Sequence, residues 1–234
     1  MARTGMIRLA ILISGRGSNM LALADAIEDF GIDAEIAIVI SNKDCDGITL
    51  AAKRRISTKV IKRHDFDTRS NHDSAIAAAI TASNADYVFL AGYMAILSAD
   101  FVEEFIGKLI NIHPSLLPEF KGLDTHQRAI DAGALRHGAS VHLVNAELDD
   151  GPLILQAWLD VNRRDTAEGL ATRVLRLEHQ LYPFVLFSLA KQHLGLSPDG
   201  AEWRVKDAAL TAAPAAMRDV LAPCLCWPDD LSMQ

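Results

Sequence analysis

Residues 6–31, MIRLAILISGRGSNMLALADAIEDFG, hold a strand, a glycine turn and a helix in immediate succession. The run from Met6 to Ser14 is short and apolar, as is typical of a buried strand in a parallel sheet. From Asn19 onward the apolar residues recur at helical spacing, and Gly31 stands where helices commonly end in a left-handed residue. We therefore predict a buried strand that turns directly into an amphipathic helix.

The same alternation of strand and helix continues along the chain. We predict strands at residues 34–41, 57–63 and 85–94, separated by helices at 47–56 and 67–83. Strands that alternate with helices form a parallel sheet with right-handed crossovers. The predicted fold class is therefore α/β, with a Rossmann-like, mostly parallel sheet that carries helices on both faces.

The second part of the chain adds a fifth strand and then a pair of strands. The fifth strand is predicted at residues 108–114, where the apolar run Leu109-Ile110 leads into an Asn and a His. Two further strands, 138–148 and 151–161, are expected to be joined by a tight turn at Asp149–Pro152, because the Asp-Gly-Pro sequence is typical of turns.

A long helix is predicted over residues 166–192, in which Pro183 is expected to bend or restart the helix. No internal repeat or linker interrupts this pattern. The expected division of the chain is one domain over 1–197, with halves at about 6–105 and about 106–197, and a tail of unknown role over 198–234.

Composition narrows the class of protein. Half of the 234 residues are hydrophobic and aromatic residues are few, as in an aliphatic α/β core. The net charge of −7 argues against a nucleic-acid backbone as the main ligand. The three cysteines lack the spacing of a disulfide framework, which favours a reducing cytoplasm. No stretch reaches the length of a membrane span, so no membrane partner is expected.

The glycine turn, SGRGSN at residues 14–19, is a candidate anion site. Small residues let backbone N–H groups at a helix N-terminus close around an anion. A dinucleotide fingerprint is not satisfied, because Met20 replaces its third glycine and no acidic residue ends the second strand. A monophosphate therefore fits better than NAD. The alternative interpretation of the loop is a plain tight turn with Ser18 or Asn19 as N-cap.

A second candidate site combines Asn111, His113 and Asp149. Residues two apart in a strand point to one face, so Asn111 and His113 lie together at a carboxyl edge, where open α/β sheets bind ligands. An amide N–H and a protonated imidazole can stabilise an oxyanion. Asp149 can orient the imidazole and collect a proton from an attacking amine. This set suits acyl transfer without a covalent intermediate.

Structural explanations exist for each of these residues taken alone. A lone His113 is most simply a buried histidine bonded to backbone, and Asp149 alone is most simply a turn residue. His142 lies inside a strand and is explained as a satisfied strand residue. A metal site built from His113, His137 and His142 has no recognisable ligand spacing.

Six segments together resemble the folate-dependent phosphoribosylglycinamide formyltransferases of purine synthesis. In the order of that family they are LISGRGSN, SNKDCDG, LAGYMAILS, NIHPSLLPEFKGLDTH, HGASVHLVNAELDDGPLILQ and EHQLYP. The resemblance covers roughly residues 6–195, so the tail lies outside it. The resemblance implies transfer of a formyl group from 10-formyltetrahydrofolate, as co-substrate, to the glycine amine of glycinamide ribonucleotide, without a metal.

The resemblance also implies roles for individual residues. Asn111, His113 and Asp149 would be catalytic. The substrate would be bound by Gly17, Ser18, Asn19 and Glu178, with the glycine loop at its phosphate and Glu178 at its ribose. The folate would be bound by Arg69, Met94, Ala95, Ile96, Leu97, Val144, Asn145 and Glu147.

Two positions depart from the family pattern. Ala95 stands where some members carry Arg, and Asp150 stands where Gly or Ala is common, so that a second carboxylate adjoins Asp149. The alternatives within reach of the same residues are a 10-formyltetrahydrofolate hydrolase and a non-catalytic nucleotide-binding module. A monomer or a homodimer is expected, and the segment from Leu116 to about His126 is expected to form a loop that closes over the site.

Overall fold

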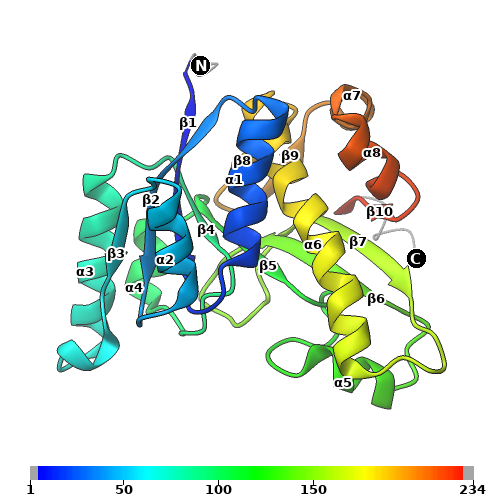
Figure 1. The fold of residues 1–234 in the computed structure, drawn as a ribbon, viewed down its shortest axis with the longest axis horizontal. Coiled ribbons are helices and arrows are strands. Elements are labelled where there is room, and N and C mark those ends of the chain that lie inside the picture. The colour runs from blue at the N-terminus through cyan, green and yellow to red at the C-terminus, as the bar shows by residue number, and fades with distance from the viewer. Residues whose placement is uncertain (1–4, 229–234) are drawn as a thin grey trace. The chain divides into compact units, whose positions relative to one another are not determined.

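The computed structural model describes residues 5–228 (Figure 1). Contacts along the backbone divide the chain into two compact units, Met1–Asn111 and Ile112–Gln234. Strand β5 (Leu109–His113) begins in the first unit and ends in the second. The predicted fold class is confirmed, since the chain has a mostly parallel central sheet with flanking helices.

The first unit is a parallel α/β structure. Its sheet has the order β5-β4-β1-β2-β3, and every pairing in that order is parallel. Helix α1 contacts α2, and α3 contacts α4. Its elements before β5 are β1 (Ile7–Ile13), α1 (Ser18–Phe30), β2 (Ala34–Ser41), α2 (Asp46–Lys53), β3 (Thr58–Val60), the 3₁₀ turn η1 (Arg63–Asp65), α3 (Arg69–Ala82), β4 (Tyr87–Leu90) and α4 (Ala99–Glu104).

The quoted opening stretch forms the centre of this unit. Strand β1 pairs with β2 on one side and β4 on the other, which explains why its sequence is apolar on both faces. Helix α1 ends at Gly31, whose φ of 57° is left-handed and whose N–H bonds to Ile27 O, as predicted. Thr68 caps α3 by accepting a hydrogen bond from Asn71 N.

Two predicted strands end earlier than expected. Strand β4 ends at Leu90 rather than at residue 94, because Gly92 adopts a φ of 77° and turns the chain away from the sheet. Strand β6 (Arg136–Leu143) ends five residues before the predicted 148. The prediction of a tight turn at Asp149–Pro152 was therefore wrong, since the connection between β6 and β7 runs over residues 144–152.

Gly151 explains why this longer loop can close. Leu143 N donates a 2.9 Å hydrogen bond to Pro152 O at the base of the loop. A Cβ on Gly151 would lie 1.8 Å from Leu143 O, so only glycine fits at this point. The chain between these two residues is then free of the sheet and can carry functional side chains.

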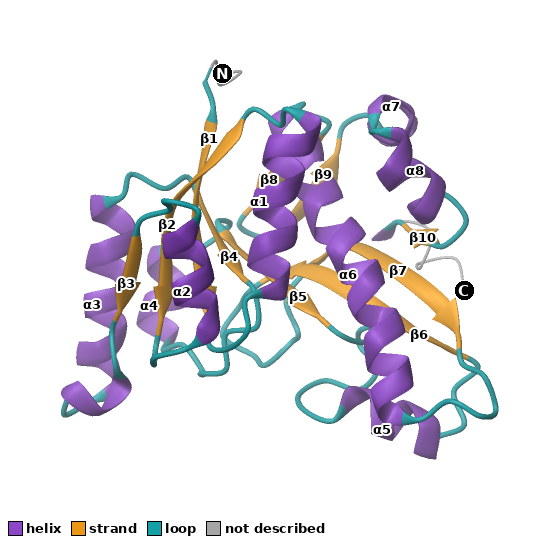
Figure 2. Cartoon of the chain, viewed as in Figure 1, coloured by secondary structure: helices purple, strands orange, loops and turns teal. Residues whose placement is uncertain are grey.

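The second unit combines an antiparallel sheet with one long helix (Figure 2). Strand β7 (Leu153–Asp160) pairs antiparallel with β6 on one edge and with β10 (Leu225–Cys226) on the other. Helix α6 (Ala167–Ala190) packs on β6 and β7 and continues through Pro183, so the predicted restart does not occur. The remaining elements are α5 (Thr125–Asp131), β8 (Leu194–Ser197), β9 (Gly200–Trp203), α7 (Lys206–Ala212) and α8 (Ala215–Leu221).

The tail from residue 198 to 228 is folded, and residues 229–234 lie outside the described part. Strand β9 pairs with β8 as a hairpin, and α8 contacts α6. Trp203 Nε1 donates a 2.9 Å hydrogen bond to Ile154 O. The ring of Trp203 lies 4.4 Å from that of Trp227 and 6.5 Å from that of Phe184, measured between centroids. The tail is therefore attached to the sheet and the long helix through aromatic packing.

In residues 5–228, no helix is both long enough and apolar enough to cross a lipid bilayer.

We predict that Trp203→Ala lowers the free energy of unfolding by about 3 kcal/mol, because it removes a large ring and the hydrogen bond to Ile154. Trp203→Phe keeps most of the ring and should cost less than half as much. Urea unfolding of the purified variants measures both values. Equal stability of Trp203→Ala and the unmodified chain would show that the tail does not pack as described.

Candidate active site

The glycine loop of the first unit lies where β1 passes into α1. Gly17 is the N-cap of α1 with a φ of 74°, and no side chain makes a capping hydrogen bond there. The alternative of a plain turn named Ser18 or Asn19 as the N-cap, and that assignment was wrong because the N-cap is Gly17. Ser18 is the first residue of the helix, and Asn19 is buried at 7% exposure. A helix of this length without a side-chain cap presents its N-terminal dipole and backbone to a ligand.

Gly47, at the start of α2, shapes this loop and was given no role from the sequence. A Cβ on Gly17 would lie 2.9 Å from Gly47 Cα, and one on Gly47 would lie 2.8 Å from Gly15 O. Gly47 N also donates a 3.1 Å hydrogen bond to Gly15 O. Two backbone segments can approach this closely only because both residues are glycine. The segment SNKDCDG, quoted above for its resemblance, contains this glycine.

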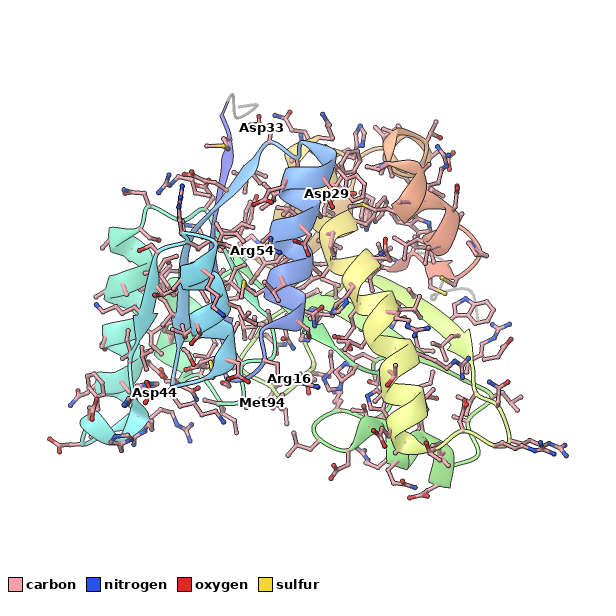
Figure 3. The ribbon with its side chains drawn as sticks, in the orientation of Figure 1. Arg16, Asp29, Asp33, Asp44, Arg54 and Met94 are labelled. Carbon is pink, nitrogen blue, oxygen red and sulfur yellow. The ribbon has the colours of Figure 1, made fainter. Side chains whose placement is uncertain are left out.

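Ser14 connects the glycine loop to the loop that follows β4. Its Oγ donates to Asn42 Oδ1 at 2.8 Å and accepts from Met94 N at 2.8 Å. The other end of that second loop is fixed where Ser98 N donates to Asp73 Oδ2 at 2.8 Å. Figure 3 shows the labelled Arg16 and Met94 at the same end of the unit. The two loops therefore form one edge, held by buried polar side chains.

Residues 94–97 lie on this edge as an exposed apolar segment. Met94 is 69% exposed and Ile96 is 63% exposed, while Ala95 is exposed and Leu97 is half-buried. Arg69, the first residue of α3, is also exposed. Large apolar side chains held open by a fixed backbone are suited to contact an apolar or aromatic ligand.

In the second unit, His113 has an acceptor at each ring nitrogen. Its Nε2 lies 3.1 Å from Phe120 O, and its Nδ1 lies 3.4 Å from Asp149 Oδ2. Both ring nitrogens therefore face hydrogen-bond acceptors, a carbonyl and a carboxylate. The side chain is 7% exposed. Asn111 lies two residues earlier in the same strand, on the same face.

Asp149 lies in the 144–152 loop with a φ of 48°, a left-handed conformation that Asp tolerates better than most residues. Its Oδ2 accepts a 3.0 Å hydrogen bond from Gly122 N in addition to facing His113. Its Oδ1 lies 3.8 Å from His142 Nε2. The carboxylate is therefore held by the His113 imidazole and a backbone N–H, with the His142 ring beside it and its side chain only 10% exposed.

His142 is thus part of this cluster, although its position inside a strand suggested only a satisfied strand residue. Burial lowers the pKa of His142, and a hydrogen bond between its Nδ1 and Leu143 O opposes that shift. A neutral ring that donates from Nδ1 presents the lone pair of Nε2 toward Asp149. The sequence does hold a signal for His142, because the loop that carries Asp149 begins directly after its strand.

The segment that follows β5 is anchored by buried polar groups. Ser140 Oγ donates to Ser115 O at 2.6 Å and accepts from Leu117 N at 3.0 Å. Gln156 Nε2 donates to Leu117 O at 2.9 Å and to Ser140 Oγ at 2.7 Å. Side chains of two neighbouring strands, β6 and β7, thereby fix where the segment leaves the sheet. Buried polar networks of this kind fix a single arrangement when every member is paired.

A second histidine pair supports Phe120, whose carbonyl faces His113. His126 Nδ1 lies 3.1 Å from His137 Nε2, and the rings of Phe120 and His137 meet edge-on with centroids 5.9 Å apart. His137 is fully buried. Burial, together with neighbouring His126 and His113, lowers the pKa of His137 to about 4. Burial, together with neighbouring His113, also lowers the pKa of His126.

The remaining predicted residues of the second unit lie on the 144–152 loop and on α6. Asn145 shapes the loop, since its Oδ1 accepts from Glu147 N at 3.0 Å and its Nδ2 donates to Asp150 O at 3.3 Å. Val144 is half-buried and Glu147 is exposed. Glu178 is buried within α6 at 7% exposure.

A metal site was the remaining alternative for the histidines. Within residues 5–228, no group of three or more His, Cys, Asp and Glu side chains is arranged to hold a metal ion.

A family model described as formyl transferase matches residues 7–186. The chain belongs to the formyl transferase family. The resemblance seen in the sequence is therefore confirmed. The match ends inside helix α6, so strands β8 to β10 and helices α7 and α8 lie beyond the family region.

Individual relatives cover most of the chain. A phosphoribosylglycinamide formyltransferase of Haemophilus influenzae is 43% identical over 182 residues, which are 77% of this chain and 86% of that protein. The structure of a protein of the same name from Coxiella burnetii is 41% identical with a TM-score of 0.81, covering 85% of this chain and 93% of that one. One from Brucella melitensis is 48% identical with a TM-score of 0.76, covering 79% and 96%.

The lowered pKa of His137 predicts a loss of stability in mild acid. A histidine whose folded pKa, about 4, lies below its ordinary value of 6.5 binds its proton more readily in the unfolded chain. The free energy of unfolding should therefore fall as pH drops through this window, by about 2 kcal/mol from His137 between about pH 7 and pH 5.

Urea unfolding at both pH values measures the loss. In His137→Gln the part of the loss due to this residue should disappear, whereas His64→Gln, at a histidine with 80% exposure, should behave as the unmodified chain. An equally steep loss in His137→Gln would contradict the assignment.

Proposed function

We propose that this member of the formyl transferase family transfers the formyl group of 10-formyltetrahydrofolate to the glycine amine of glycinamide ribonucleotide, a step of purine synthesis. The names of the relatives support glycinamide ribonucleotide as the acceptor of the formyl group. The single observation in this chain that carries the proposal is the distance of 3.4 Å between Asp149 Oδ2 and His113 Nδ1. His113 itself follows Asn111 by two residues in strand β5. This arrangement suits attack by an amine on a formyl carbon.

In the proposed reaction, the amine nitrogen forms a bond to the formyl carbon as the carbonyl oxygen becomes an oxyanion. The Asn111 amide donates a hydrogen bond to that oxygen, and the positive ring of His113 stabilises its charge at short range. The bond from carbon to the folate nitrogen then breaks. Asp149 accepts the proton that the amine loses, through water, and the folate nitrogen gains a proton. Because Phe120 O and Asp149 hold both nitrogens of His113, its contribution is mainly its charge.

The substrate ribonucleotide is proposed to bind through its phosphate at Gly17, Ser18 and Asn19. The supporting observation is the N-terminus of α1 without a side-chain cap, shaped by close packing of Gly17 on Gly47. Glu178 is proposed to bind the ribose hydroxyls. The carboxylate of Glu178 is buried in α6 at 7% exposure, and buried carboxylates in proteins are paired with polar groups.

The folate is proposed to contact the exposed segment Met94–Leu97, mainly through its backbone, and Arg69 at the negatively charged end of the ligand. The fixed position of Met94 N on Ser14 Oγ supports a preformed backbone surface. In the second unit, the proposed folate contacts are Val144, Asn145 and Glu147.

The proposal treats the family region of the chain as one formyltransferase domain. We further propose that the protein works in the cytoplasm as a monomer or a homodimer. Its substrates are proposed to be small molecules and not nucleic acid. The odd number of cysteines, three, favours a reducing compartment.

A formyl-transfer assay with purified protein tests the proposal directly. Folate absorbance is followed with and without glycinamide ribonucleotide, and we expect turnover that requires the ribonucleotide. Folate turnover without the ribonucleotide would contradict the proposal in favour of hydrolysis. Absence of turnover in both cases would remove the catalytic assignment.

Substitutions of the two central residues test their roles. Asp149→Asn removes the proton acceptor and the counter-charge of His113, and His113→Ala removes the charge near the oxyanion. Each should lower kcat by about 100- to 1000-fold while leaving ribonucleotide binding within a few-fold. Isothermal titration with the ribonucleotide provides the binding control. A variant of either residue with near-normal kcat would refute its assigned role.

A further inference from the structure

Three successive residues of the segment after β5 each contact the cluster around His113. Phe120 O faces His113 Nε2 at 3.1 Å, and Gly122 N donates to Asp149 Oδ2 at 3.0 Å. Between them, Lys121 Nζ forms an ion pair with the carboxylate of Asp150. The backbone turns here through two residues with positive φ values, 55° at Phe120 and 80° at Gly122. One short stretch therefore reaches His113, Asp149 and Asp150 at once.

Lys121 is itself held in place from the other side. Arg128 Nη1, from helix α5, donates to Lys121 O at 2.6 Å and to Leu123 O at 3.2 Å. The Arg128 guanidinium also lies 5.7 Å from the centre of the Phe120 ring. The backbone of the segment is thus fixed by α5 while its Lys121 side chain faces the 144–152 loop. The ion pair joins two loops that are also linked where Gly122 N donates to the Asp149 side chain.

Asp150 adds a second carboxylate directly after Asp149 in the chain, and Lys121 is the ion-pair partner of Asp150. Two adjacent carboxylates raise the local negative charge, and an unpaired neighbour favours bound protons on Asp149 and His113. The Lys121 and Asp150 side chains are 35% and 52% exposed, so their ion pair adds little to overall stability. Its contribution is therefore local, to the charge that the proton-accepting carboxylate experiences.

We propose that Lys121 is a positioning residue that cancels the charge of Asp150 and so keeps Asp149 able to accept a proton in the working pH range. This inference rests on the proposed function. Asp150 departs from the Gly or Ala common at its position in the resembling family, and Lys121 compensates for that departure.

The charged and titratable groups around the pair come from several elements. They are His113 on β5; Glu119, Lys121 and Asp124 on the segment after it; His126 and Arg128 on α5; His137 and His142 on β6; and Glu147, Asp149 and Asp150 on the loop after β6. Only Lys121 and Asp150 change in the three charge-pair variants, so the other groups contribute equally to those proteins and to the unmodified chain.

The test compares the unmodified chain with Lys121→Met, Asp150→Asn and the double variant, through the pH profile of kcat/KM for formyl transfer. In Lys121→Met the unpaired Asp150 should move the acidic limb up by about 0.5 to 1 pH unit, because it favours protonation. In Asp150→Asn the unpaired Lys121 should move it down by a similar amount. The double variant should return to within about 0.2 units of the unmodified chain. Added salt should shrink both single shifts.

Glu119→Gln is the matched control, since Glu119 is an exposed carboxylate in the same segment. Its acidic limb should stay in place. If the acidic limb of kcat/KM lies at the same pH in all the variants and transfer activity is intact, the inference about Lys121 is overturned and the proposed function still holds. A double variant as displaced as Lys121→Met would also overturn it, because charge cancellation requires rescue. Failure of the proposed function would appear separately, as an unmodified chain without ribonucleotide-dependent transfer.

Discussion

The placement of Asp149 between His113, His142 and Gly122 is the constraint on which the site of the second unit depends. A carboxylate that is 10% exposed needs hydrogen-bond partners, and Oδ2 has a backbone N–H and the His113 imidazole, while the His142 ring lies 3.8 Å from Oδ1. These contacts in turn require the 144–152 loop to close at Gly151 and the segment after β5 to lie over it. The loop geometry and the chemistry of the cluster therefore have the same origin.

Buried polar groups away from the reacting residues support this arrangement. Ser140 and Gln156, on adjacent antiparallel strands, bind the backbone at Ser115 and Leu117. They fix the start of the segment that places Phe120 O on His113. Catalytic geometry tolerates only small displacements, so a fixed departure point in the sheet is as necessary as the catalytic groups themselves.

Local sequence patterns predicted much of the fold. The apolar run before the glycine turn, the helical spacing after it, and the terminal Gly31 each specify their structure through short-range effects, and the structure agrees at each. The ends of β4 and β6 were not predictable in the same way. They are set by Gly92 and by closure at Gly151, where contacts between distant residues decide how far a strand continues.

The candidate site shows the same division. Asn111 and His113 follow from strand periodicity, and the resemblance to the family points to Asp149. Ser14 and Gly47 could not be assigned, because their importance comes from partners far along the chain: Met94 for Ser14, and Gly15 and Gly17 for Gly47. The packing of the tail was likewise not predictable from its sequence. Its attachment depends on Trp203 meeting Ile154 and Phe184.

The central claim is that Asp149 and Phe120 O together hold His113 as a charged ring. Nitrogen-15 NMR of histidine-labelled protein, comparing the unmodified chain with Asp149→Asn at about pH 7, tests it most directly. The account predicts that both His113 ring nitrogens carry a proton in the unmodified chain and that one nitrogen loses its proton in Asp149→Asn. The same His113 signals in both proteins would contradict it.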